Sequence, residues 1–209
     1  MNSPSSHHLH YQRTSAAPGP FRGGLHETLR GICRTYLKLG GWRLEGDWPG
    51  HKKCVLLAAP HTANIDGFNM LATAAHFRVN LKWMGKKSLT TGPLGGLVKW
   101  AGCVPVDRAA AHDVVEQMGR AFDNADELVL AVAPEGTRAR NPEWKTGFYR
   151  IAQRANVPIV MSVLDYGTKT IRLSGEIRPT GDLEADMALI KSHYATATGK
   201  VADQFTLGD

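Results

Sequence analysis

The chain has 209 residues, of which 43% are hydrophobic and 21% are charged, and this composition suits one globular domain with a substantial core. The net charge is +6 and the sequence pI about 9.3, so we expect anionic partners such as phosphorylated ligands or an anionic membrane surface. We expect no nucleic-acid partner, because no basic stripe is interleaved with aromatic residues.

The sequence has no pattern of a membrane-spanning or secreted protein. No apolar run approaches the roughly 18 residues that cross a bilayer, and the first 30 residues lack the apolar region of a cleaved signal peptide. The three cysteines, Cys33, Cys54 and Cys103, have no metal-like spacing, which indicates a reducing compartment without a disulfide framework. We therefore predict a cytoplasmic protein that is soluble or peripheral.

The first 40 residues differ from the remainder in composition. Residues 1–24 are rich in Ser, Pro, Gly and His without any period, which predicts a disordered leader. Residues 25–40 follow helical spacing and are predicted to form a basic amphipathic helix that ends at a Gly pair. Two interpretations of this helix stay open: it lies in a membrane interface, or it packs on the core, and both can hold together. Its apolar face comprises Leu25, Leu29, Ile32, Tyr36 and Leu39, and its basic face comprises Arg30, Arg34 and Lys38.

Residues 41–209 alternate between short apolar segments and amphipathic segments, which indicates strands alternating with helices. We therefore predict a single α/β domain whose largely parallel, mixed sheet is flanked by helices. The predicted strands are residues 42–46, 54–59, 80–84, 103–106, 128–133, 157–164 and 170–177. The predicted helices are residues 67–77, 93–101, 110–124, 147–155 and 183–198.

His61 and Asp66 stand at the turn between the second predicted strand and the helix that follows it. In α/β folds, reactive groups lie at such a position, at the carboxyl end of a strand beside a helix N-terminus. A carboxylate that accepts a hydrogen bond from one imidazole nitrogen leaves the other nitrogen free as a general base. The pair is therefore predicted to be the His–Asp half of a catalytic triad, with a substrate hydroxyl as the nucleophile. The plainer interpretation is that Asp66 caps the helix and that His61 is an ordinary loop residue.

Basic residues follow three other predicted strands. Lys86 and Lys87 follow the strand 80–84, Arg108 follows the strand 103–106, and Arg138 follows the strand 128–133. If these strands are parallel, their carboxyl ends lie at one edge of the sheet together with His61. Arginine at such an edge binds phosphate with two parallel hydrogen bonds, so we expect an anion site there.

The segment around Arg138 has further features. Glu135 is placed to orient the guanidinium of Arg138, and Gly136 permits a tight backbone turn. Trp144 and Phe148 follow closely along the chain. We interpret these two aromatic residues either as the lining of a substrate groove or as plain core.

Four short blocks occur in a fixed order. The first is H-x4-D at residues 61–66, and the third is E-G-T-R at residues 135–138. The second block lies between them, where residues 102–108 match a glycine-led strand that ends in arginine. The fourth follows the third, where residues 157–160 open an apolar strand with Val-Pro. In these blocks the chain resembles the glycerolipid acyltransferases, the bacterial 1-acylglycerol-3-phosphate acyltransferase-like proteins.

This resemblance implies an O-acyltransferase. His61, supported by Asp66, would deprotonate the hydroxyl of a lysophospholipid such as 1-acylglycerol-3-phosphate, and the oxygen would attack the thioester of acyl-CoA or acyl-carrier protein. Backbone amides at the helix N-terminus after His61 would stabilise the oxyanion. Thioesters are reactive, so no metal or other cofactor is expected. The resemblance assigns acceptor binding to Arg108, Glu135, Gly136, Thr137 and Arg138, and more weakly to Lys86 and Lys87.

Two positions depart from the family pattern. Pro60 stands where Asn or Ser is commonest, and Met161 stands where a second Pro often closes the fourth block. These departures bear on the acceptor, so acylation of another lyso-lipid, an aminolipid or a glycolipid, is the first alternative. Hydrolysis by an activated water and a non-catalytic lipid- or anion-binding module are the others. The partners expected are the acyl thioester, the lysophospholipid and the inner face of the cell membrane, on which the protein would be peripheral.

Overall fold

The computed structural model describes residues 24–106 and 111–208, so residues 1–23 of the leader predicted at 1–24, and Arg108, lie outside the described residues. The strands are β1 (Arg43–Glu45), β2 (Lys53–Ala59), β3 (Leu81–Lys86), β4 (Cys103–Val106), β5 (Leu128–Val132), β6 (Ile159–Asp165) and β7 (Thr170–Ile177). The helices are α1 (Gly24–Leu39), α2 (Asn64–His76), α3 (Lys87–Thr91), α4 (Gly95–Trp100), α5 (Ala111–Asn124), α6 (Gly147–Ala155) and α7 (Leu183–Ser192), followed by a short 3-10 helix at Ala202–Gln204.

The strands form one seven-stranded sheet in the order β1-β7-β6-β2-β5-β3-β4. Five strands, from β6 to β4 in this order, run in the same direction, and β7 pairs with β6 in the antiparallel direction. β1 is parallel to β7 and so also runs against the other five. The predicted α/β domain with a largely parallel, mixed sheet is confirmed.

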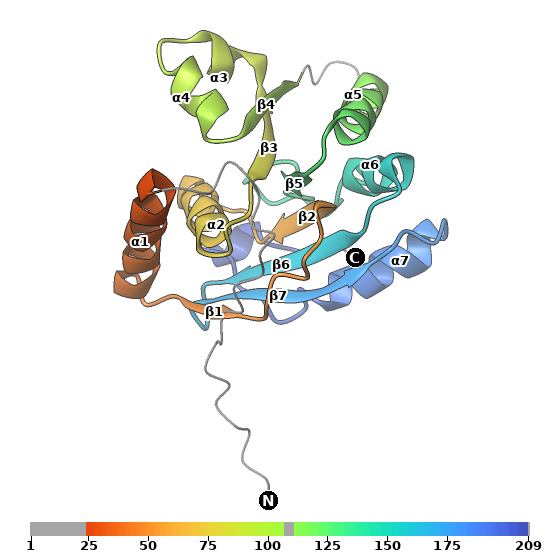
Figure 1. Ribbon diagram of the computed structural model, residues 1–209. Helices are drawn as coiled ribbons and strands as arrows, with labels where there is room; N and C mark the ends of the chain where they lie inside the picture. Colours follow the sequence, from red (N-terminus) through yellow and green to blue (C-terminus); the bar gives the residue numbers. More distant parts are fainter. Residues whose placement is uncertain (1–23, 107–110, 209) are drawn as a thin grey trace, which may run out of the picture.

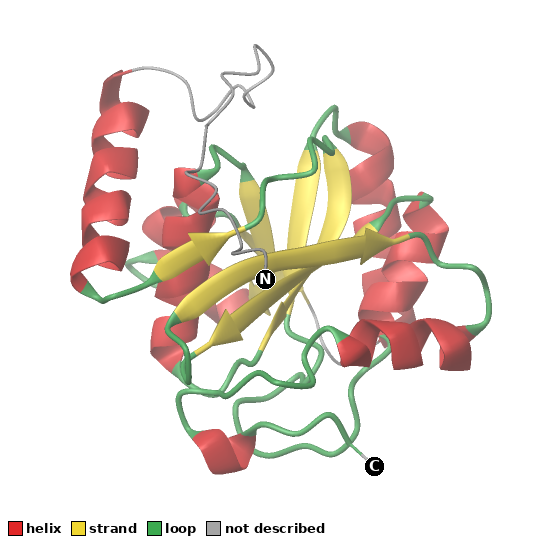
Figure 2. Cartoon of the chain, turned by 90° about the horizontal axis from the view of Figure 1, so that it is seen from below, coloured by secondary structure: helices red, strands yellow, loops and turns green. Residues whose placement is uncertain are grey.

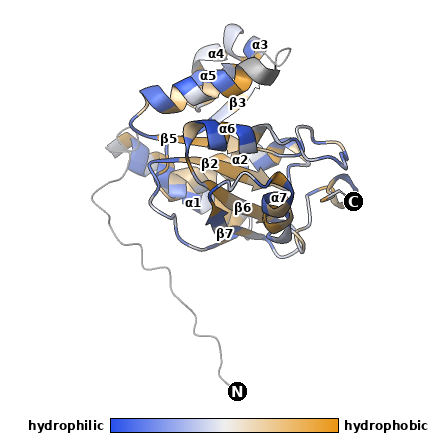
Figure 3. Ribbon diagram, turned by 90° about the vertical axis from the view of Figure 1, so that its right-hand side faces the viewer, coloured by the Kyte–Doolittle hydropathy of each residue, from blue (hydrophilic) through white to orange (hydrophobic). Residues whose placement is uncertain are grey.

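Helices cover both faces of the sheet (Figures 1 and 2). α1 and α2 lie on one face, and α5, α6 and α7 lie on the other, while α3 and α4 extend from the end of β3. Since β6 is buried along its whole length, its near-continuous apolar sequence follows from this double cover. Figure 3 shows the same pattern as hydrophobic central strands beneath helices with hydrophilic outer surfaces.

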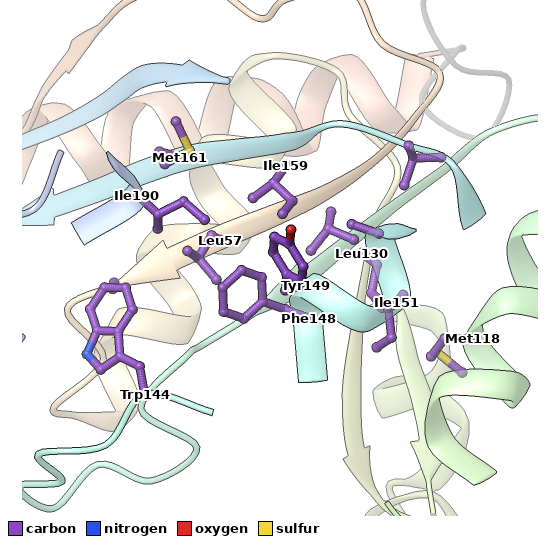
Figure 4. Packing of buried hydrophobic residues seen from close by; sticks show 14 of the residues in the cluster. Leu57, Met118, Leu130, Trp144, Phe148, Tyr149, Ile151, Ile159, Met161 and Ile190 are labelled. Atoms are coloured by element: carbon purple, nitrogen blue, oxygen red, sulfur yellow. The ribbon is translucent and has the colours of Figure 1, made fainter. Parts of the chain in front are cut away.

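The larger core lies between the sheet and the helices α5, α6 and α7. Figure 4 shows Leu57 of β2 beside Phe148 of α6, with Ile190 of α7 and Met118 of α5 in the same cluster. All four side chains are fully buried. This cluster packs against the face of β2 and β5 that α5, α6 and α7 cover, and so helps to fix the loops at the carboxyl ends of these strands.

α1 packs on α2 through a mixed side that contains Arg30, Cys33 and Leu37, and most of its apolar stripe faces outward. Leu37 is 2% exposed and packs against Ala72, and the side chain of Arg30 is 12% exposed. The Arg30 Nε donates a hydrogen bond to the His76 carbonyl oxygen at 3.0 Å, which ties α1 to the end of α2. The most exposed members of the apolar stripe are Leu25, Ile32 and Leu39.

Three helices differ by more than one residue from their predicted bounds. α2 begins at Asn64, three residues before the predicted start at residue 67, so Asp66 lies in its first turn. The segment predicted as one helix at residues 93–101 is preceded by a second helix, α3, from which it is separated at Gly92 and Pro93. α7 ends at Ser192, although helical spacing continued to residue 198. After α7 the chain turns so that the buried Tyr194 hydroxyl donates to the Leu57 carbonyl oxygen at 2.7 Å. This long-range contact outweighs the local preference for helix.

Candidate active site

Loops that follow parallel strands meet at one edge of the sheet. β2, β5 and β3 are neighbours that run in the same direction, with Leu57 opposite Val132. The loop after β2 carries His61, the loop after β5 carries Arg138, and β3 ends at Lys86. The parallel direction of these strands brings the three loops to one edge, as the sequence predicted.

His61 faces Asp66 across the turn that precedes α2. The Nδ1 atom of His61 lies 3.6 Å from Oδ2 of Asp66, somewhat longer than a direct hydrogen bond. The His61 side chain is 32% exposed, whereas that of Asp66 is 3% exposed. The carboxylate is therefore sealed behind the imidazole, and Nε2 is the nitrogen left to meet a ligand.

Asp66 also holds the turn and the start of α2 together. Its Oδ2 accepts hydrogen bonds from the backbone amides of Thr62 and Ala63, both at 2.7 Å, as in a capping box. Its Oδ1 accepts a hydrogen bond from the Tyr166 hydroxyl at 2.6 Å. Burial alone would raise the pKa of Asp66, but the neighbouring imidazole and the three hydrogen bonds outweigh burial and lower that pKa. The capping interpretation and the dyad interpretation thus describe the same carboxylate.

Two of the amides expected to stabilise an oxyanion, and the amide of His61 itself, already donate hydrogen bonds within the site. Those of Thr62 and Ala63 donate to Asp66, and that of His61 donates to the Oε1 atom of Glu135 at 2.8 Å. A backbone amide has one proton to donate, so none of the three is open to a developing oxyanion. The assignment of oxyanion donors from the sequence is therefore wrong for Thr62 and Ala63, and it stays a prediction for the next amides of α2.

Glu135 supports the His61 loop and does not bind Arg138. It is buried, and besides the bond to the His61 amide, its Oε2 atom has no hydrogen-bond partner among residues 24–106 and 111–208. Burial raises the pKa of Glu135 above its ordinary value. Arg138 instead donates from Nη1 to the Oδ1 atom of Asn64, the first residue of α2. The expected orientation of Arg138 by Glu135 is therefore corrected, and Asn64 takes that place.

The loop from Gly136 to Arg138 presents one exposed cation beside the dyad. Gly136 has a φ of +68°, in the left-handed region, which confirms the predicted tight turn. The Thr137 Oγ1 atom accepts a hydrogen bond from the Ala139 amide at 3.2 Å and so shapes the loop from within. Arg138 is exposed and lies against Asn64, which places its guanidinium next to the His61 turn.

The remaining candidate residues differ in whether they line the cavity beside His61 or lie in the core. Lys86 is exposed at the end of β3 and lines the cavity beside His61, whereas Lys87 begins α3 and is not part of that lining. Trp144 is buried in the core against Tyr194, with ring centroids 5.3 Å apart. Phe148 belongs to the same core cluster and also lines the cavity. The groove interpretation thus fits Phe148, and the core interpretation fits both residues.

The C-terminal segment, residues 201–208, supports both loops of the site. The Val201 amide donates to Thr62 Oγ1 at 3.2 Å, and the Trp144 Nε1 donates to the Thr206 carbonyl oxygen at 3.0 Å. No pattern in the sequence predicts this support, because the segment contains no recognisable motif and contacts residues that are distant along the chain.

A cavity of about 1160 Å³ opens beside His61. Its polar part includes His61, Asp66, Arg138 and Lys86, all at the carboxyl edge of the sheet. The rest of the lining is mainly apolar and reaches along α2 and β3. This apolar part includes Phe68, Leu71, Phe77, Val79, Trp83 and Met84. The site therefore combines an imidazole and a cation with an apolar space large enough for a lipid chain.

The comparisons with known proteins agree with this geometry. A family model described as Acyltransferase matches residues 44–164, more than half of the chain, including both loops of the site. No curated protein matches the chain significantly. The fold is similar to that of the 1-acyl-sn-glycerophosphate (LPA) acyltransferase PlsC from Thermotoga maritima, with a TM-score of 0.54 and 13% identity over 81% of this chain and 78% of that chain. The chain belongs to the acyltransferase family of enzymes.

Proposed function

We propose that the protein transfers a fatty acyl group from an acyl thioester to the hydroxyl of a lysophospholipid such as 1-acylglycerol-3-phosphate. The observation that carries this proposal is the position of His61. Its Nδ1 atom faces the buried Asp66, and its ring lines a largely apolar cavity that Arg138 also lines. A base, an anion-binding cation and an apolar space together match an acceptor with a hydroxyl, a phosphate and an acyl chain.

The reaction follows from the two nitrogens of His61. Nε2 takes the proton of the acceptor hydroxyl, and the oxygen attacks the carbonyl carbon of the thioester. Asp66 stabilises the imidazolium that forms, since its Oδ2 atom lies 3.6 Å from Nδ1. The tetrahedral intermediate then expels the thiolate, which takes the proton back from Nε2. The products are an ester and a free thiol, and His61 returns to its starting state.

Arg138 is the residue that we propose for the acceptor phosphate. It is an exposed arginine on the loop after β5, and Asn64 holds its guanidinium beside the dyad. A guanidinium pairs with phosphate through two parallel hydrogen bonds. The Thermotoga maritima protein of similar fold is an acyltransferase of 1-acyl-sn-glycerophosphate, which supports a phosphate-bearing acceptor. A role for Arg108 stays a prediction from the sequence.

The apolar part of the cavity is the proposed place of the acyl chain. Phe68, Leu71 and Trp83 line it in continuity with His61, so a chain there would bring its thioester carbon toward Nε2. Either acyl-CoA or acyl-carrier protein is compatible with the basic net charge of +6. Since a thioester is already activated toward attack, the proposed reaction uses no metal and no further cofactor.

We propose that the enzyme works as a peripheral protein on the inner face of the cell membrane. Within the described part of the chain, no helix combines the length and the hydropathy that crossing a bilayer requires. Large apolar side chains are nevertheless exposed on α1, at the start of α2, and on and between α3 and α4, and two of them, Phe68 and Leu89, line the cavity. A lipid surface would cover such residues and would deliver the acceptor to the cavity. The exposed apolar residues are Leu25, Ile32, Tyr36, Leu39, Phe68, Leu89, Leu94, Leu97 and Trp100.

The test is thiol release from palmitoyl-CoA by the purified protein, over a panel of lysolipid acceptors with and without phosphate. We expect release that depends on a phosphate-bearing acceptor and falls about 10³-fold in His61→Ala, because a positioned general base contributes roughly 10²- to 10⁴-fold. His51→Ala is the matched control, since His51 precedes β2 at the opposite end of the strand and pairs with Glu176.

Other results would replace the proposal. Release without any acceptor, with free fatty acid as the product, would identify a hydrolase. Release with acceptors that lack phosphate would assign the enzyme to another lyso-lipid. Full activity in His61→Ala would overturn the role of the dyad.

A further inference from the structure

We propose that Tyr166 is a positioning residue of the His61–Asp66 dyad and that Asn69 and Tyr36 connect it to the N-terminal helix α1. The proposal rests on the function proposed above, in which His61 is the base. It concerns three residues that none of the sequence motifs includes. A chain of three hydrogen bonds, from Tyr36 to Asp66, carries it.

Tyr166 fixes the oxygen of Asp66 that the turn leaves open. Oδ2 of Asp66 faces His61 and accepts the two backbone amides, while Oδ1 accepts the Tyr166 hydroxyl at 2.6 Å. A carboxylate held at both oxygens cannot rotate about its terminal torsion. Burial, and then the hydrogen bond to Asp66, raise the pKa of Tyr166 well above its ordinary value, so its hydroxyl keeps its proton and donates.

The ring of Tyr166 is itself held in place. It follows β6 directly and packs edge-to-face against Trp42, with ring centroids 4.8 Å apart. The Lys169 Nζ lies 4.9 Å from the Trp42 ring centroid and 5.4 Å from that of Tyr166. Trp42 stands between α1 and β1, so the packing of the ring and the hydrogen bonds of the hydroxyl both lead toward α1.

The hydrogen bonds continue from Tyr166 to α1 in one direction. Asn69 of α2, which is fully buried, donates from Nδ2 to the Tyr166 hydroxyl oxygen at 3.1 Å. The Tyr36 hydroxyl donates to Asn69 Oδ1 at 2.9 Å. Each group donates toward the carboxylate and accepts from the side of α1, an arrangement in which the bonds strengthen one another. The position of α1 is thereby coupled to the orientation of Asp66.

A second tyrosine–carboxylate pair, Tyr149 and Asp186, provides a control that distinguishes a positioning role from a general effect on stability. The Tyr149 hydroxyl donates to Oδ2 of the buried Asp186 at 2.7 Å, and that carboxylate also accepts a backbone amide, from Thr180. Tyr149→Phe therefore removes a buried tyrosine–carboxylate hydrogen bond like that of Tyr166→Phe. Asp186 has no contact with His61, so the control affects folding and leaves the dyad unchanged.

The experiment compares the steady-state kinetics of the full-length wild type, Tyr166→Phe, Tyr36→Phe and Tyr149→Phe between pH 5.5 and 9. We expect Tyr166→Phe to lower kcat roughly tenfold with KM unchanged within about twofold, because the change affects the orientation of a catalytic group. The acidic limb of the pH–rate profile should move to higher pH, since a carboxylate that has lost a donor stabilises a protonated imidazole more strongly. Tyr36→Phe should act in the same direction, by about two- to threefold, because it is two hydrogen bonds further away.

The outcomes distinguish this inference from the proposed function. An unchanged kcat and pH profile in Tyr166→Phe, or an equal loss of kcat in Tyr149→Phe, would overturn the positioning role. An effect of Tyr166→Phe without any effect of Tyr36→Phe would overturn the connection to α1. If the wild type transfers no acyl group, the proposed function fails, and the ¹⁵N resonances of the His61 imidazole still decide the inference. They should differ in titration midpoint between wild type and Tyr166→Phe, and coinciding titrations would contradict it.

Discussion

The carboxyl edge of the sheet and the helix α1 have opposite distributions of polar and apolar groups. At the edge, polar side chains such as Asp66 and Glu135 are buried and take up backbone amides of the His61 turn. On α1, the side that contains Arg30 faces the domain, and the stripe that contains Leu39 faces outward. Each region departs from the rule that apolar residues are buried and charged residues are exposed.

The two departures have different physical consequences. A buried carboxylate is stable only while its donors stay in place, so the edge is a rigid arrangement in which each group depends on its neighbours. An exposed apolar stripe needs no partner to keep its conformation. Its contact with water is unfavourable, however, until another surface covers it. We therefore expect the edge to serve the chemistry and α1 to contact a surface outside the chain.

Among substitutions at the carboxyl edge outside the His61–Asp66 dyad, Arg138→Ala should cause the largest loss of kcat/KM. We expect Arg138→Ala to lower kcat/KM for a phosphate-bearing acceptor about 100-fold, because charged hydrogen bonds contribute roughly 1.5–3 kcal/mol and 1.4 kcal/mol is tenfold. Thioester hydrolysis without acceptor should change by less than about threefold, since no phosphate takes part. Arg140→Ala, which removes a bond to the Asp203 carbonyl oxygen in the same loop, is the control. Equal loss of both activities would mean that Arg138 supports the fold or binds the donor.

Glu135 tests whether the rigidity of the edge depends on a charge or on an acceptor. Glu135→Ala leaves the His61 amide without its partner, which should lower kcat about 10- to 100-fold and destabilise the fold by about 1–3 kcal/mol. Glu135→Gln keeps an oxygen that can accept the same amide, so kcat should stay within about threefold of the wild type. Urea unfolding and steady-state kinetics measure both quantities. A Gln variant as impaired as the Ala variant would show that the charge is required.

The comparison also separates what sequence can predict from what it cannot. His61, Asp66, Glu135 and Arg138 follow buried strands, and parallel strands end at one edge, so their convergence follows from local patterns alone. The partners within the edge do not follow. Glu135 and Arg138 were expected to contact each other. Instead, Glu135 accepts a hydrogen bond from the His61 amide, and Arg138 donates one to Asn64. The turn at Gly136 lies between the two residues.

Contacts between residues that are far apart along the chain cannot be predicted from local sequence patterns. Tyr166 is 100 positions from Asp66, and neither residue type nor spacing indicates that they touch. The helical period of α1 was predicted, but the period is the same whichever side packs on the domain. The choice of side depends on α2, where the His76 carbonyl oxygen accepts a hydrogen bond from Arg30 and Ala72 packs against Leu37.

Leu37 and Leu39 provide a matched pair on α1. Leu37 is 2% exposed and Leu39 is 84% exposed, so the same substitution meets opposite surroundings. Leu37→Ala should lower the free energy of unfolding by about 2 kcal/mol, and Leu39→Ala should change it by less than about 0.5 kcal/mol. In sedimentation with anionic vesicles, Leu39→Ala combined with Ile32→Ser should bind less well than the wild type. Unchanged vesicle binding would show that the exposed stripe does not meet the membrane.

The smallest expected effect concerns His76, where α1 meets the end of α2. Burial, together with the charges of Arg34, Arg30 and Arg78, lowers the pKa of His76 from 6.5 to about 4. The unfolded chain therefore takes up a proton at a pH where the folded chain does not. The stability that the neutral His76 contributes is complete above pH 6.5 and declines as the pH falls toward about 4.

Urea unfolding at pH 7 and at pH 5 measures this contribution. We expect the wild type to lose on the order of 1 kcal/mol more than His76→Gln between the two values, after allowance for screening of a partly exposed group. The interval lies above the range in which Asp66, whose pKa is lowered, takes up its proton, and Glu135 titrates alike in both proteins. Parallel pH dependences would mean that His76 is protonated in the folded state. The arginines of α1 would then tolerate a positive charge at the contact with α2, and the helix would pack less tightly there than the burial of Leu37 indicates.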